Sequence, residues 1–170
     1  RDVTALLLPL LAAVPVMAAA LTAMLPWRAV GRAMALAVPA ATAVAGFGLL
    51  LHHRSDPVVA TQVGGFVPGV SIPFVSDPFT ALMLIATGVV ALTALVFCAQ
   101  TGEFDRSRYF APLALLLLAG ANGALLTGDL FNLFVFVEVM LLPSYALIAM
   151  TGTWRRLGVG RLFVVINLLT

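Results

Sequence analysis

The pattern of apolar and polar residues divides the chain into long apolar stretches separated by short polar connections. The stretches cover residues 3–25, 33–51, 79–99, 109–127 and 130–150, and a sixth opens at residue 162. A helix needs roughly 20 apolar residues to cross the hydrocarbon core of a bilayer, and the first five stretches are close to that length. The pattern therefore predicts an all-α fold, a polytopic bundle of transmembrane helices.

The sixth stretch reaches only Thr170, where nothing in its pattern would stop a helix. We therefore expect helix 162–170 to be incomplete. On this view residues 1–170 form the N-terminal part of one membrane domain, a fragment of a longer subunit.

Composition supports a membrane protein, which has the lipid bilayer as one partner. Hydrophobic residues make up 62% of the chain and charged residues 9%, and the mean hydropathy is +1.13; soluble domains are far more polar. The nine basic residues, all arginine, exceed the seven acidic ones too slightly to indicate a nucleic-acid partner. The one cysteine, Cys98, excludes an internal disulfide bond and is expected to be a packed side chain.

The arginines gather on alternate connections, which indicates the orientation of the helices. Two of them, Arg1 and Arg54, lie on one side of the predicted bundle, and seven lie on the other. The seven are Arg28, Arg32, Arg106, Arg108, Arg155, Arg156 and Arg161. Because arginine-rich connections tend to stay in the cytoplasm, the N-terminus is expected outside.

The longest connection, residues 52–78, is then external. Its segments 61–67 and 70–75 are separated by a Pro-Gly pair and predict a short β-hairpin lying over the bundle, between the second and third helices. Asp77 followed by Pro78 is typical of an N-cap and first helical position, so the third helix is expected to begin there.

Two adjacent histidines, His52 and His53, invite a metal-site interpretation. Neighbouring positions on a helix point about 100° apart, however, and no further ligand is spaced to join them. We therefore expect an ordinary interfacial cluster with Arg54 and Asp56.

The stretches 109–127 and 130–150 are joined by only Gly128 and Asp129, which predicts an antiparallel helix pair. The first stretch carries small residues at i, i+3, i+4 and i+7, a spacing that lets two helix backbones approach closely. These residues are Gly120, Gly123, Ala124 and Thr127.

Two polar residues of this pair have both a structural and a functional interpretation. Asn122 points away from the small-residue face and either forms an interhelical hydrogen bond or lines an ion pathway. Asp129 is expected to cap the helix that follows, and it could double as an entry-side charge.

Glu138 lies near the middle of the otherwise uncharged stretch 130–150, where a carboxylate is costly and usually serves ions or protons. Helical spacing places it on an apolar face with Phe131, Phe134, Val135, Leu141, Leu142 and Tyr145. Burial on that face is expected to keep the carboxyl protonated until a cation approaches. The structural alternative is a permanently protonated group bonded to a neighbouring helix.

Pro143 favours the functional interpretation of Glu138. It has no amide hydrogen, so it frees the carbonyl of Val139 and is expected to kink the helix beside the acid. A broken hydrogen-bond ladder at this depth favours a hydrated cavity. The chain contains no lysine and its arginines lie at the ends of the stretches, so a cationic partner is expected from later helices or another subunit.

Covalent chemistry has no candidate in this sequence. We find no nucleotide-binding loop, no spaced set of metal ligands and no nucleophile triad. No cofactor and no bound metal are expected, and the chain is predicted to be part of a transporter rather than an enzyme.

The segment from Leu115 to Met140, LLLLAGANGALLTGDLFNLFVFVEVM, resembles the signature of the D subunit of Mrp-type multisubunit cation/proton antiporters. That family belongs to the proton-translocating membrane subunits shared with respiratory complex I and membrane-bound hydrogenases. Segments 77–83 and 164–169 are also similar to D-subunit sequences. Val137 departs from the pattern, which commonly has an aromatic residue there, and Pro143 is more like the complex I relatives.

The resemblance implies that Glu138 is the glutamate that pairs with a lysine on the seventh helix and takes part in proton translocation. It also implies a longer subunit built from inverted repeats. Its partners would be other antiporter subunits in a bacterial plasma membrane, and the transported ions would be protons and monovalent cations.

Three functional hypotheses result. The first is a subunit of a sodium/proton antiporter that moves protons through Glu138. The second is a proton-pumping membrane subunit of a complex I-type NADH:quinone oxidoreductase or a membrane-bound hydrogenase. The third is a structural subunit that only anchors its partners, in which Glu138 is dispensable.

Overall fold

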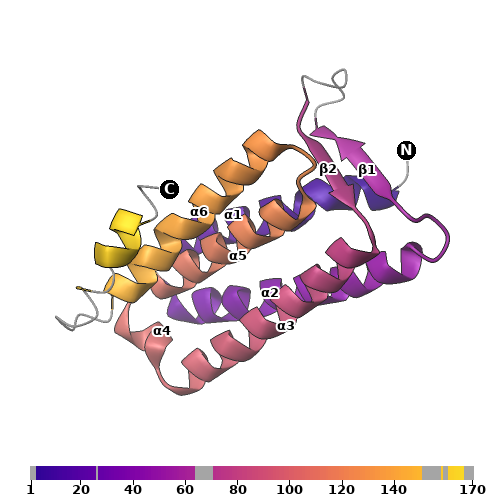
Figure 1. Ribbon diagram of the computed structural model, residues 1–170. Coiled ribbons are helices and arrows are strands. Elements are labelled where there is room, and N and C mark those ends of the chain that lie inside the picture. Colours follow the sequence, from indigo (N-terminus) through magenta and orange to yellow (C-terminus); the bar gives the residue numbers. More distant parts are fainter. Residues whose placement is uncertain (1–2, 26, 64–70, 151–157, 159–160, 167–170) are drawn as a thin grey trace.

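The fold is a bundle of helices with a two-stranded hairpin at one end (Figure 1). The structure is a computed structural model, and it describes residues 3–25, 27–63, 71–150, 158 and 161–166. The elements are α1 (Val3–Met24), α2 (Arg28–His52), β1 (Val59–Gln62), β2 (Pro73–Ser76), α3 (Pro78–Gln100), α4 (Glu103–Arg106), α5 (Phe110–Leu126) and α6 (Leu130–Ala149). Residues 161–166 are also helical. The predicted helix bundle, with a short hairpin between the second and third helices, is confirmed.

Four of the described helices, α1, α2, α3 and α6, are long and apolar enough to cross a membrane. The apolar helix α5 is shorter, with 17 residues. The four-residue helix α4 was not predicted, because its sequence is polar and too short to show a period. It follows Gly102, whose backbone has a φ of 78°, a left-handed conformation that glycine adopts without strain.

Helices α2 and α3 are in very close contact. A Cβ atom added at Gly88 of α3 would lie 2.6 Å from the amide nitrogen of Ala43 and 2.8 Å from the carbonyl oxygen of Pro39, both on α2. A Cβ atom added at Gly46 of α2 would lie 3.0 Å from the amide nitrogen of Ile85 on α3. Small residues therefore set the distance between these two backbones, as they do in many membrane helix pairs.

The buried apolar side chains form three clusters along the bundle. The cluster nearest the hairpin joins α1, α2, α3 and α5 to both strands, through residues such as Leu8, Phe74 and Leu126. A second cluster, around Leu115, lies between α1, α2 and α5. The third gathers at the α4 end around Phe104.

The hairpin pairs β1 and β2 in antiparallel register, with Val59 opposite Ser76 and Gln62 opposite Pro73. The strands begin and end at other residues than the sequence predicted, since β1 starts two residues earlier and β2 three residues later. Burial explains the observed register, because Val59 and Phe74 pack into the hairpin-end core. The predicted Pro-Gly turn lies outside the described residues.

The α4 end of the bundle lies opposite the hairpin (Figure 1), and arginines of two connections form contacts there. Arg32 forms an ion pair with Asp105 at 3.6 Å, and its Nη2 donates to the Ala99 carbonyl at 3.4 Å. Arg108 donates to the carbonyl of Ala23, also at 3.4 Å. The connections that the sequence assigned to one side of the membrane thus share one end of the structure, although Arg155 and Arg156 lie outside the described residues.

Candidate functional site

The turn between α5 and α6 is held by a compact set of hydrogen bonds. Asp129 is the N-cap of α6, and its Oδ2 accepts from the amide of Asn132 at 3.0 Å. The Thr127 hydroxyl oxygen accepts from the Asp129 amide at 3.3 Å and from the Asn132 side chain at 3.1 Å. These bonds satisfy donors at the start of α6 that no helical partner can reach, so the cap predicted for Asp129 is present.

The hairpin supports the same turn from outside. The amide of Gly128 donates to the carbonyl of Pro73 at 2.9 Å, and Thr127 pairs with Phe74 in an isolated antiparallel β-bridge. The ring of Phe74 also meets that of Phe136 on α6 edge to face, with centroids 6.2 Å apart. The strand β2 therefore fixes the position of the α5–α6 pair at this end of the bundle.

The predicted small-residue face brings α5 and α6 into contact. A Cβ at Gly120 would lie 2.8 Å from the amide nitrogen of Met140 and 2.9 Å from the carbonyl oxygen of Phe136. A Cβ at Gly123 would overlap the ring of Phe136. Only glycine therefore fits at these two positions with the backbones so close.

Glu138 lies on the side of α6 that faces away from α5. It is exposed, as are Phe131, Phe134, Val135 and Leu142 from the same face. The burial expected from the apolar neighbours of Glu138 does not occur within the described chain, because most of that face is exposed and only Leu141 and Tyr145 are partly buried. In the part of the chain that the structure describes, Glu138 takes part in no ion pair.

The depth of Glu138 agrees with an intramembrane position. It is the ninth residue of α6, which at 1.5 Å per residue places it about 12 Å from the start of the helix and roughly 17 Å from its end. In the most apolar segment of α6 only 11% of the residues are buried, against 22–33% in the corresponding segments of the other three candidate spans. The helix that carries the acid is thus the most peripheral of the four.

Pro143 does not end α6, which continues to Ala149. The proline is buried, in contrast to Glu138, so the two residues lie on different sides of the helix. Because proline has no amide hydrogen, the carbonyl of Val139 loses its helical donor one residue from Glu138.

Asn122 is fully buried and connects three helices. Its Nδ2 donates to the carbonyl of Leu11 in α1 at 3.0 Å and to the hydroxyl of Thr42 in α2 at 3.2 Å. Its Oδ1 is buried and accepts no hydrogen bond from the described residues. The sequence predicted either an interhelical hydrogen bond or a place in an ion pathway for Asn122, and the structure shows the hydrogen bond.

The two histidines separate rather than converge on a site. His53 is buried, and its Nδ1 donates to the carbonyl of Asp56 at 2.9 Å, while Nε2 lies 2.9 Å from the hydroxyl of Ser76 on β2. His52 lies 3.5 Å from the carboxylate of Asp56. His53 therefore links the end of α2 to the hairpin, a role that the sequence did not predict because its partner is 23 positions away.

Asp77 caps α3 as predicted, with Oδ1 accepting from the amide of Thr80 at 2.7 Å. Hydrogen bonds from the backbone and side chain of Thr80 lower the pKa of the Asp77 carboxyl below its usual value of 3.8. Within the described ranges, no group of three or more His, Cys, Asp or Glu side chains lies close enough to hold a metal ion.

Comparison with known proteins places this arrangement in a family. No protein-family model matches the chain. It is 44% identical over 120 residues to the D subunit of the Na(+)/H(+) antiporter of Alkalihalophilus pseudofirmus, which is 70% of this chain and 24% of that protein. The structure of the Mrp complex from a Dietzia species contains a chain that matches with a TM-score of 0.88 and 43% identity, over 95% of this chain and 31% of that one. The chain is a homologue of the D subunit of Mrp antiporters.

Other relatives of this D-subunit homologue extend the comparison. The D subunit of a probable K(+)/H(+) antiporter of Rhizobium meliloti is 40% identical over 107 residues, 63% of this chain and 20% of that protein. A chain of the archaeal membrane-bound sulfane sulfur reductase matches with a TM-score of 0.79 over 94% of this chain and 33% of its own, but at 24% identity it shows a common fold alone. The chain spans between a fifth and a third of the lengths of these relatives.

Proposed function

We propose that this chain is part of the D subunit of a multisubunit sodium/proton antiporter in a bacterial plasma membrane, and that Glu138 is a group through which protons cross. The sodium and potassium in the relatives' names leave the choice of monovalent cation to experiment. Other antiporter subunits are the proposed partners.

The observation that carries this proposal is the place of Glu138 on α6. A carboxylate in the middle of a candidate span is too costly to face lipid, by about 2.5–3.5 kcal/mol or more. Since the described chain leaves this face uncovered, protein or water from elsewhere in the assembly must cover it. A group in that position is available to a cationic partner and to a proton pathway.

The backbone around Glu138 is held firmly for this task. The residues two positions before and after it, Phe136 and Met140, are those that pack on the glycines of α5. This packing fixes where the carboxyl group projects, which matters for a proton donor and acceptor that must meet a partner at hydrogen-bond distance. The carbonyl of Val139, freed by Pro143, offers an acceptor for a water molecule beside it.

In this proposal Glu138 works by alternating between two states. In one state the carboxyl carries a proton. In the other state a cation or a cationic side chain lies beside the carboxylate, and the proton has left. The return of the proton completes the cycle.

The second candidate function is a redox-driven proton pump. The fold that the chain shares with the sulfane sulfur reductase chain favours it, but no feature of the site around Glu138 does. Purification of the native complex that contains the full-length subunit separates the two functions. Small membrane subunits without redox groups, together with sodium-driven proton movement after reconstitution into vesicles, support the antiporter. Co-purified flavin or iron–sulfur subunits, with no sodium-driven proton movement, would overturn it.

A further inference from the structure

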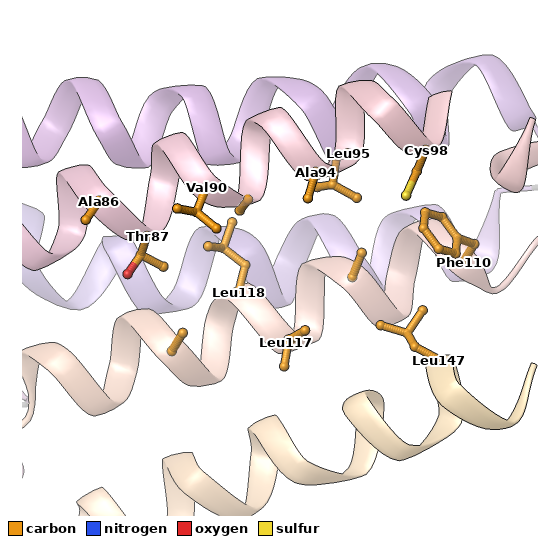
Figure 2. Close-up of a pocket in the computed structure, with 13 residues that line it drawn as sticks. Ala86, Thr87, Val90, Ala94, Leu95, Cys98, Phe110, Leu117, Leu118 and Leu147 are labelled. Carbon is orange, nitrogen blue, oxygen red and sulfur yellow. The ribbon is translucent and has the colours of Figure 1, made fainter. Parts of the chain in front are cut away.

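An apolar groove lies between α3, α5 and α6, well away from the face that carries Glu138. Its volume is about 550 Å³, and Thr87 and the thiol of Cys98 are the only side chains in its lining that are not hydrocarbon. Figure 2 shows α3 along one side and α5 and α6 along the other, with Cys98, Phe110 and Leu147 at the same end.

The groove has the length of one bilayer leaflet. Its lining on α3 extends from Ala86 to Cys98, which at 1.5 Å per residue is about 18 Å. Half of the hydrocarbon core of a bilayer is about 15 Å thick. The groove therefore extends from near mid-membrane to the end of the bundle that carries α4.

At the α4 end the groove lies next to a polar pocket of about 270 Å³. Phe110 and Leu147 line both cavities, and the polar pocket adds Glu103, Arg106 and Ser107. The apolar groove at hydrocarbon depth thus adjoins a charged pocket at the level where the lipid headgroups lie.

Arg106 is the described arginine that lines this polar pocket. Arg32 is bound to Asp105, and Arg108 extends to the carbonyl of Ala23 and packs over the ring of Tyr109. Arg106 contacts Glu103 through one nitrogen at 2.8 Å, and its side chain is 71% exposed. A guanidinium has five N–H donors, so donors remain for a second anion, and its planar fork binds phosphate as well as carboxylate.

We propose that this double cavity binds a membrane phospholipid, with one acyl chain in the groove and the phosphate on Arg106. The phosphate approaches the donors that Glu103 leaves free, since the carboxylate of Glu103 repels it on the other side. The site is independent of the proposed transport function, because none of its lining residues is part of the α6 face around Glu138.

The test uses the full-length subunit in its native complex, reconstituted into nanodiscs with a photoactivatable phosphatidylglycerol whose acyl chain carries a diazirine. A diacylglycerol with the same labelled chain serves as the probe without phosphate. After irradiation, mass spectrometry measures the labelling of the peptides from α3 and α5. We expect the phospholipid to label these peptides several-fold more than the diacylglycerol.

Two sets of variants, each with its controls, locate the phospholipid. Ala94→Phe fills the groove and should reduce labelling several-fold, whereas Val96→Phe on the opposite side of α3 should not. Arg106→Gln should remove the preference for the phospholipid, whereas Arg108→Gln and Glu103→Gln should keep it. Equal labelling by both probes would overturn the proposal. Labelling that Ala94→Phe leaves unchanged would also overturn it, and this is the result expected if an additional protein helix occupies the groove.

Discussion

Asn122 and Leu11 are joined across two helices by a hydrogen bond of 3.0 Å from the side-chain Nδ2 of Asn122 to the main-chain carbonyl of Leu11. That carbonyl has no donor in its own helix, because the residue four positions later is Pro15, which has no amide hydrogen. The proline thus creates an unsatisfied acceptor in α1, and the asparagine of α5 satisfies it. Both Asn122 and Pro15 are fully buried.

Asn122→Leu should destabilise the subunit by about 1 kcal/mol, because it leaves the Leu11 carbonyl unpaired in an apolar interior. In a Pro15→Ala background the same change should have a smaller effect, since the alanine amide then bonds this carbonyl within α1. The measurement is a double-mutant cycle on thermal unfolding of the assembled complex. Additive effects of the two substitutions would show that the asparagine acts through packing alone.

Gly120→Ala should prevent α5 and α6 from packing and lower the amount of assembled subunit strongly. The added Cβ would meet backbone atoms of α6 at 2.8–2.9 Å, and backbone cannot rotate away as a side chain can. Gly48→Ala is the matched control, because a Cβ there has nothing within 4 Å and alanine favours the helix. Blotting of membranes measures both, and normal levels of the Gly120→Ala protein would contradict the packing described.

Asp129→Ala should lower stability by about 1 kcal/mol, because it removes the acceptor for the first amides of α6. Asp129→Asn should have little effect on either stability or ion exchange, since asparagine caps as well as aspartate does. Thermal unfolding and ion exchange are measured on the same preparations. A loss of exchange in a stable Asp129→Asn protein would instead assign the carboxylate a role in the ion pathway.

Asp77 should make stability depend on pH at the acid end. Its pKa is lowered in the folded protein by the hydrogen bonds from Thr80, so its stabilising effect is complete above the unfolded value of 3.8. The effect is lost as the pH falls through the lower folded pKa. Asp77→Asn keeps a cap but cannot titrate, so its unfolding temperature should fall less on acidification than that of the wild type. Identical pH profiles would contradict this assignment.

Local rules predicted much of this fold. The caps at Asp77 and Asp129 and the glycines of α5 follow from residues within a few positions of one another, and the structure contains them as expected. Contacts between distant residues could not be predicted in this way. The partner of Asn122 is 111 positions away, and the partner of His53 is 23 positions away.

Within the described residues Glu138 is exposed, and the sequence did not show this for a different physical reason. A membrane helix is apolar on nearly every side, so hydropathy does not show which side faces the protein. Phe131 and Phe134, which share the face of Glu138, are 76% and 63% exposed in the described chain. The small residues Gly120 and Gly123 were the better signal, because they mark where another backbone approaches.

The most direct test of the central claim is proton exchange by everted membrane vesicles that contain the full-length subunit in its complex. Glu138→Gln keeps the size of the side chain but cannot release a proton, so we predict that it abolishes cation-dependent exchange while assembly, measured by blotting, stays normal. Glu138→Asp still titrates and should retain part of the activity. Exchange at the wild-type rate in Glu138→Gln vesicles would contradict the account and leave Glu138 with a structural role.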